Sequence, residues 1–141
     1  MTQYVDTSVL VAALTNERET ARMQNWLAAQ TNGDLVVSEW VATEFSAALS
    51  IKLRTGQIEA GHRADALAMF AQLRANNFGT LPVSALEFRT AATYADQHAL
   101  CLCAGDALHL AICASYGAKL CTLDRRLSQA GPSLGVQTAL L

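Results

Sequence analysis

The sequence carries little positive charge. Only ten of its 141 residues are Lys or Arg, against twelve Asp or Glu, and the formal net charge is −2. Proteins that bind nucleic acid over a broad surface use an excess of cationic side chains to neutralise phosphates. The composition therefore excludes a basic nucleic-acid-wrapping protein, and a phosphate-bearing substrate would need local help from a metal ion or clustered Arg.

Long apolar runs are also missing. No stretch approaches the roughly 20 apolar residues of a membrane span. The first residues lead directly into a strand-like segment, without the basic and apolar regions of a signal peptide. We expect a cytoplasmic protein with no membrane partner.

The four cysteines lack the spacing of a zinc site. Cys101 and Cys103 have no second pair and no nearby His at zinc-finger spacing. Cys113 and Cys121, like the first two, lie in apolar segments. We interpret all four as buried, reduced thiols that act as small hydrophobic side chains.

Short apolar runs alternate with longer segments of helical spacing, which is typical of βαβ units around a parallel sheet. We predict one α/β domain, residues 1–141, built as a three-layer α/β/α sandwich whose central parallel sheet has four or five strands. Strands are expected at 2–5, 35–37, 79–83, 119–123 and 136–140. Helices are expected at 9–14, 21–30, 57–76 and 107–116, between Ser38 and Gly56, and directly after Asp124. Thr7 or Ser8 would cap the first of them. A further helix is expected to start at a capping box of Ser84 and Glu87 and to run through 94–98.

Four acidic residues stand where a carboxylate is costly unless it is paired or bound to a metal. Asp6 and Asp124 follow the predicted strands 2–5 and 119–123, Asp106 opens a strongly apolar helix, and Glu44 lies about two turns into a helix. Ligands of parallel sheets bind beyond the carboxyl ends of the strands, where the strand order reverses. The four acids therefore converge if strands 2–5, 35–37 and 119–123 are neighbours. An all-oxygen cluster is what Mg²⁺ and Mn²⁺ prefer, and it suits phosphodiester hydrolysis.

Simpler interpretations exist for the single residues. One Asp at a helix start is usually a cap, and Glu44 is compatible with a solvated or Arg-paired position. His109 lies three residues after Asp106 on the same helical face, as a ligand or base would, but we favour a packing role in an apolar helix. Arg125 and Arg126 either steady phosphates beside the metal or form a solvated helix start.

Four segments carry a resemblance to a known family. They are Tyr4–Leu10 (YVDTSVL), Ser38-x5-Glu44, Ala104–Ala111 (AGDALHLA) and Leu120–Leu127 (LCTLDRRL). In these segments, which are in order along essentially the whole chain, the sequence resembles the PIN-domain family, especially the VapC-type toxins of bacterial toxin–antitoxin pairs. The Asp-Thr-Ser motif alone is weak, whereas its combination with the two later motifs is specific.

The resemblance implies a metal-dependent ribonuclease with the α/β/α PIN fold. The family's metal-binding acids are matched one for one, by Asp6, Glu44, Asp106 and Asp124. Its supporting hydroxyl positions are matched by Thr7 or Ser8 and by Thr122. The resemblance also implies a homodimer, silenced by a cognate antitoxin whose C-terminal segment packs over helices near the active site.

The expected reaction is hydrolysis of RNA by metal-activated water. The carboxylates hold one or two Mg²⁺ or Mn²⁺ ions, and a metal-bound water attacks phosphorus in line. Asp6 and Asp106 are expected to be direct ligands, Asp124 to bind directly or through water, and Glu44 to orient the attacking water.

Other functions fit less well or remain open. A haloacid-dehalogenase-type phosphatase needs a second acid where this chain has Ser8, and a response-regulator receiver needs paired acids that are absent. The open alternative is a catalytically silent PIN scaffold that binds RNA or a partner protein, although such a scaffold has little need of all four acids.

Overall fold

The computed structural model describes residues 1–141 and contains a five-stranded sheet in which every pairing is parallel. The strands are β1 (Gln3–Val5), β2 (Leu35–Ser38), β3 (Gly79–Leu81), β4 (Lys119–Thr122) and β5 (Thr138–Leu140). Their order across the sheet is β3-β2-β1-β4-β5. The predicted parallel sheet is confirmed, and β1, β2 and β4 are neighbours, as convergence of the acids requires.

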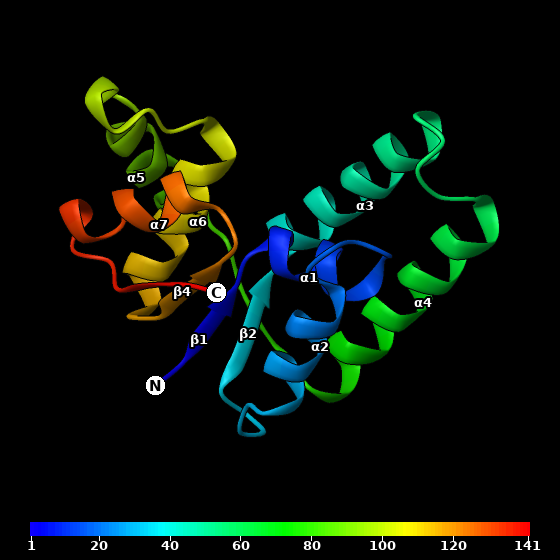
Figure 1. Ribbon diagram of the computed structural model, residues 1–141. Helices are drawn as coiled ribbons and strands as arrows, with labels where there is room; N and C mark the ends of the chain where they lie inside the picture. Colours follow the sequence, from blue (N-terminus) through cyan, green and yellow to red (C-terminus); the bar gives the residue numbers. More distant parts are fainter.

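Helices cover both faces of the sheet (Figure 1). One layer comprises α1 (Thr7–Leu14), α2 (Thr20–Ala28), α3 (Glu39–Arg54) and α4 (Ala60–Asn76). The other comprises α5 (Ala85–Ala95), α6 (Ala104–Tyr116) and α7 (Arg125–Ala130), with 3-10 turns η1 (His98–Leu100) and η2 (Pro132–Leu134). Right-handed crossovers explain this division, because the chain moves one way along the sheet from β1 to β3 and the other way from β3 through β4 to β5.

The core lies around β1 and α6. Tyr4 is aligned with Val36 of β2 and with Leu120 of β4, and both Tyr4 and Val5 are fully buried. In α6 every residue from Ala107 to Cys113 is buried. Strands buried on both faces appear in the sequence as short continuous apolar runs, which is why their positions are readable from sequence.

The predicted caps of α3 and α5 are confirmed. Ser38 accepts a hydrogen bond from the backbone N–H of Val41, 3.3 Å away. Ser84 and Glu87 form a capping box, in which the Glu87 carboxylate accepts from the Ser84 backbone N–H at 2.6 Å. No helix is both long enough and apolar enough to span a membrane.

Three predicted helix starts are wrong: α4 begins at Ala60 and not at residue 57, and the other two errors concern the acids. Helix α1 begins at Thr7, so Asp6 occupies the N-cap position and the hydroxyls of Thr7 and Ser8 are free for other bonds. Helix α6 begins at Ala104, because the Ala107 backbone N–H already bonds to the Cys103 carbonyl at 3.0 Å. Asp106 therefore lies within the first turn of α6.

Two further expectations need correction. Helix α5 ends at Ala95, and His98 belongs to the separate turn η1. All four cysteines are free thiols, but Cys101 and Cys103 are exposed, in the connection that leads into α6. Their apolar neighbours in sequence do not cover them, because this connection lies on the surface.

Candidate active site

The candidate site lies beyond the carboxyl ends of β1, β2 and β4, where the strand order reverses between β1 and β4. Asp6 follows β1, Ser38 ends β2 and Thr122 ends β4. Val5 is in register with Cys121, and the Asp6 backbone N–H donates to the Cys121 carbonyl at 3.0 Å. The parallel register therefore sets Asp6 beside Thr122, although 116 residues separate them in sequence.

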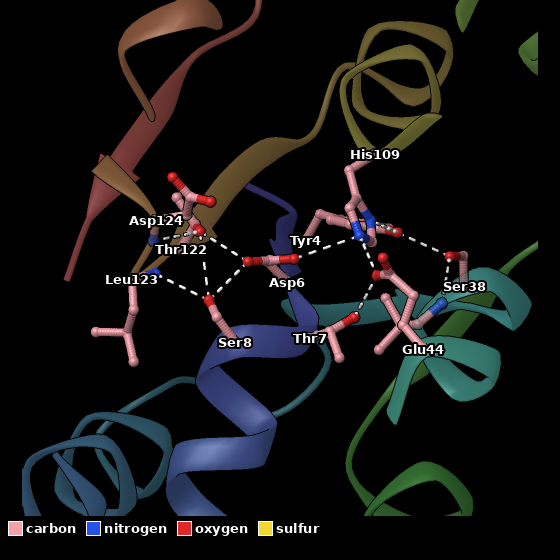
Figure 2. Close-up of polar contacts among 11 residues, drawn as sticks. Tyr4, Asp6, Thr7, Ser8, Ser38, Glu44, His109, Thr122, Leu123 and Asp124 are labelled. Carbon is pink, nitrogen blue, oxygen red and sulfur yellow. Dashed lines mark hydrogen bonds and ion pairs between the residues drawn. The ribbon is translucent and has the colours of Figure 1, made fainter. Parts of the chain in front are cut away.

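Asp6 occupies an N-cap position without capping, because its side chain accepts no hydrogen bond from a backbone N–H of the first turn of α1. Its Oδ2 instead accepts hydrogen bonds from the hydroxyls of Ser8 at 2.6 Å and Thr122 at 2.7 Å (Figure 2). The side chain is only 7% exposed. A buried carboxylate held on one oxygen by two hydroxyls presents its other oxygen, Oδ1, to the rest of the site.

Glu44 reaches the same place from α3. Its Oε1 accepts from the Thr7 hydroxyl at 2.7 Å and lies 2.5 Å from Nε2 of His109. Burial raises the pKa of Glu44, but the hydrogen bonds from His109 and Thr7 outweigh it, and the pKa lies below its ordinary value. Glu44 is therefore held ionised.

Gly105 lets α6 approach Glu44 closely. A Cβ placed on Gly105 would lie 2.9 Å from Oε2 of Glu44 and 3.4 Å from the indole ring of Trp40. The absence of a side chain at this position thus brings the first turn of α6 against α3, next to Asp106.

The surroundings of Asp106 disfavour its ionised form, although a backbone hydrogen bond at Cys103 and the charge of His109 lower its pKa in part. Burial is the largest influence and raises its pKa, and the negative charge of Asp124 raises it further. The charge of Asp6 acts in the same direction. A carboxyl whose ionised form is disfavoured by neighbouring carboxylates marks a place where a cation is stabilising.

Asp124 combines a capping role with a place in the acidic cluster. Its Oδ1 accepts from the backbone N–H groups of Arg126 at 2.9 Å and Leu127 at 3.1 Å, so it caps α7. Its backbone N–H also donates to the Thr122 hydroxyl at 2.9 Å, which links it to the hydroxyl that holds Asp6. The side chains of Arg125 and Arg126 are exposed and form no ion pair with these acids.

His109, for which the sequence favoured a packing role, contacts two of the acids. It is 1% exposed, as a packing residue would be, yet its Nε2 lies 2.5 Å from Glu44 and 3.3 Å from Oδ1 of Asp6. Burial by itself lowers the pKa of His109, but the hydrogen bond to Glu44 and the charge of Asp6 outweigh it and raise the pKa. The available signal was its position three residues after Asp106, on the same face of α6.

The comparison with known families is decisive. The PIN-domain profile matches residues 3–131 of this chain. The chain belongs to the PIN-domain family. No match was found among curated protein sequences.

Solved structures of other PIN-domain proteins superpose on this PIN domain over nearly its whole length. VapC20 from Mycobacterium tuberculosis, described as a sarcin–ricin loop cleaving toxin, gives a TM-score of 0.74 at 21% identity and covers 92% of this chain and 95% of its own. VapBC2 from Rickettsia felis, solved in complex with a DNA fragment from its promoter, gives a TM-score of 0.68 at 17% identity. The match covers 99% of this chain and 98% of its own. FitAcB from Neisseria gonorrhoeae gives a TM-score of 0.67 at 16% identity, and the match covers 96% of this chain and 94% of its own. At these identities the likeness establishes the fold.

In this PIN domain the predicted site residues gather at one sheet edge in two linked groups. Asp6, Glu44 and His109 offer potential ligand atoms that all lie within 4.8 Å of one another. Asp106 and Asp124 lie outside this tightest group, but their charges act on each other and Asp6 acts on Asp106. Thr7, Ser8 and Thr122, the predicted supporting residues, each donate a hydrogen bond to an acid.

Proposed function

We propose that this protein is a metal-dependent endoribonuclease, the toxin of a toxin–antitoxin pair, inhibited by its cognate antitoxin. One observation carries the proposal: Asp6 and Glu44 approach each other beyond the strand ends, and Asp106, whose pKa is raised by burial, is close enough to Asp124 and Asp6 for their charges to raise it further. Membership of the PIN-domain family supports it, as does the likeness to VapC20, whose described activity is cleavage of the sarcin–ricin loop. RNA as substrate and four free cysteines are both in keeping with action in the cytoplasm.

The donor chemistry of the site fits Mg²⁺ or Mn²⁺. Asp6, Asp106 and Asp124 would hold one or two ions through carboxylate oxygens, which are the ligands these cations prefer. A bound ion of this kind stabilises charge on a phosphate and lowers the pKa of a coordinated water. The hydrogen bonds from Ser8 and Thr122 keep Asp6 oriented for that role.

The remaining residues have separate tasks in this proposal. Glu44 is kept ionised and orients the attacking water through a carboxylate oxygen. Arg125 and Arg126, exposed in the first turn of α7 beside Asp124, contact phosphates of the RNA on either side of the cut. The low net charge of −2 makes such local contacts more important than a broad basic groove.

The proposal is tested by incubating purified protein with total RNA, with and without Mg²⁺ or Mn²⁺, and mapping the cut ends. Cleavage at defined sites is expected with either ion and should stop on addition of a chelator, because the carboxylates alone cannot neutralise the phosphate. Cleavage that persists in chelator would contradict the metal mechanism. An intact RNA pool in every condition, with RNA still bound, would favour the silent scaffold.

We propose that the protein is a homodimer, joined through an apolar hollow between α5, α6 and α3. The hollow has a volume of about 240 Å³ and is lined entirely by hydrophobic residues: Trp40, Phe88, Ala91, Ala92, Ala95, Ala104 and Leu108. Phe88 is 56% exposed beside it, and Leu86 on the same helix is 55% exposed. Large exposed apolar side chains of this kind mark protein–protein contacts.

Substituting Phe88→Glu should convert the dimer to a monomer, because a charge buried in an apolar interface costs several kcal/mol. The mass in solution, measured by light scattering after size exclusion, checks this. Thr93→Glu is the matched control, since Thr93 is exposed on α5 but does not line the hollow. A wild-type protein that runs as a monomer, or a Phe88→Glu variant that stays dimeric, would contradict this interface.

The proposed antitoxin contact lies on the opposite helix layer. A groove of about 320 Å³ between α1, α2 and α4 is lined mainly by hydrophobic residues, among them Leu14, Leu27, Met69 and Leu73. An apolar segment of an antitoxin would fit there, against Leu14 at the last turn of α1, which is the opposite end of this helix from Thr7 and Glu44. An adjacent reading frame for a small protein with a DNA-binding N-terminus would support the toxin role.

A further inference from the structure

We propose that His109 is a positioning residue of this site, which holds Glu44 of α3 against Asp6 at the end of β1 and is itself held by Tyr4, which Ser38 holds in turn. The inference rests on the proposed nuclease function and adds to it a residue outside the four acids. It assigns a task to a buried polar side chain that would otherwise serve only packing.

The contacts of His109 form one continuous chain across the site (Figure 2). Nε2 lies 2.5 Å from Oε1 of Glu44 and 3.3 Å from Oδ1 of Asp6. On the other side of the ring, Nδ1 lies 2.8 Å from the Tyr4 hydroxyl, which lies 2.7 Å from the Ser38 hydroxyl. The chain thus joins α6, β1 and α3 with the end of β2.

The chemistry of these partners fixes the direction of the bond at Nε2. The Glu44 carboxylate can only accept a hydrogen bond, so Nε2 carries a proton and donates it to Oε1. At Nδ1 the Tyr4 hydroxyl can donate or accept, and so can the Ser38 hydroxyl behind it, which also accepts from the Val41 backbone N–H. The hydroxyls therefore satisfy Nδ1 whether or not it bears a proton, and the ring keeps its donor pointed at the acids.

The same chain fixes the helix that carries Glu44. Ser38 is the N-cap of α3, and Glu44 lies six residues further along. The Glu44 side chain is 29% exposed, so without His109 its Oε1 keeps only the Thr7 hydroxyl as a partner and the carboxylate is free to turn toward solvent. Asp6 would at the same time lose the ring nitrogen that lies 3.3 Å from its Oδ1. Removing outer partners of this kind costs about 10- to 100-fold in activity.

Two substitutions of similar size separate positioning from packing. His109→Gln keeps an amide N–H that can donate to Glu44, whereas His109→Leu fills the apolar surroundings but has no donor. We expect His109→Leu to lower kcat about 10- to 100-fold with an unchanged KM for RNA, and His109→Gln to restore most of the lost kcat. A side chain that only packs predicts the reverse, since Leu suits an apolar core better than Gln, and that order would overturn the proposal.

Tyr4→Phe tests the second half of the chain while keeping the buried aromatic ring. It should lower kcat less than His109→Leu, and the double variant should be no worse than His109→Leu alone, because both changes disable one unit. Fully additive losses in the double variant would contradict a single chain. Melting temperatures of all variants identify any loss of activity that comes from unfolding.

Nitrogen-15 NMR of the histidine rings decides the matter independently of RNA cleavage. The His109 signals, assigned by their loss in His109→Gln, should show a protonated Nε2 in the metal-free wild type, and Tyr4→Phe should shift Nδ1. An Nε2 without a proton would disprove the chain even in an active enzyme. A wild type with the expected ring signals and no nuclease activity would instead refute the proposed function.

Discussion

Replacing Asp6 with Asn is expected to lower RNA cleavage by roughly 100- to 1,000-fold, the loss typical when one electrostatic element of a catalytic site is removed. Asp6 is the acid around which the site is arranged: two hydroxyls hold Oδ2, and Oδ1 faces His109. The substitution removes its charge and a cation-binding oxygen while changing no heavy-atom position. Initial rates on a defined RNA, with Mn²⁺ or Mg²⁺ in excess, measure the effect.

The fold should survive this substitution. The amide oxygen of the substituted side chain can still accept from Ser8 and Thr122, and one buried charge is removed from a crowded acidic cluster. Asp96→Asn, at the exposed end of α5, is the matched control for loss of one carboxylate and should cleave RNA like the wild type. Undiminished cleavage by a folded Asp6→Asn protein would remove Asp6 from the catalytic set. Growth arrest on expression should be relieved in parallel with the loss of cleavage.

The sheet edge was predictable from sequence because its signals are local. Strands buried on both faces give short apolar runs, and Asp6 and Asp124 follow two of those runs directly. The order of the strands is not a local property. The sequence does not show that β1, β2 and β4 are adjacent, whereas the structure pairs Tyr4 of β1 with Val36 of β2 and Val5 with Cys121 of β4.

The helix starts at Asp6 and Asp106 were misplaced because local capping preferences were the only guide. Asp6 has the residue type and position of an N-cap, but Ser8 and Thr122 take its carboxylate, and Thr122 is 116 residues away. Helix α6 begins at Ala104 behind Cys103, which makes no side-chain cap bond and leaves no capping signal to read. The bonds of the Asp6 carboxylate and the lack of a capping side chain at Cys103 are thus the two features that local capping preferences did not reveal.

His109 shows the same limit most clearly. Its spacing from Asp106 indicates that the two share a helical face, but the same spacing suits a core residue. The two roles are distinguished by the contacts of His109 with the Tyr4 hydroxyl on β1, 105 residues away in sequence, and with the Glu44 carboxylate on α3, 65 residues away. A single sequence does not contain that information, and only the packing of α6 against both elements reveals it.

Divalent cations are expected to stabilise the protein strongly, by about 2.7 kcal/mol when the cation is at 100 times its Kd. The reason lies in Asp106, whose pKa is raised above its ordinary value of 3.8 by burial and by the charges of Asp124 and Asp6. Because the folded state then holds the Asp106 proton more tightly than the unfolded state, ionised Asp106 destabilises the fold as pH rises above that range. At neutral pH a bound cation offsets this repulsion. Urea denaturation with and without Mn²⁺ measures the effect.

The matching variant is Asp106→Asn. Compared with the wild type, it should be more stable against urea without the cation and less stable with it. Without metal it should unfold at higher urea, since the unfavourable charge is gone while the side-chain shape remains. With Mn²⁺ it should gain much less than the wild type, because a cation ligand has been lost, and RNA cleavage should fall as for Asp6→Asn. Ionic strength is matched with NaCl, so that general screening of the cluster is not mistaken for binding. Equal stabilisation of the wild type and Asp106→Asn by Mn²⁺ would place the cation elsewhere. A metal-free Asp106→Asn protein that unfolds at lower urea than the wild type would mean that the ionised carboxylate stabilises the fold.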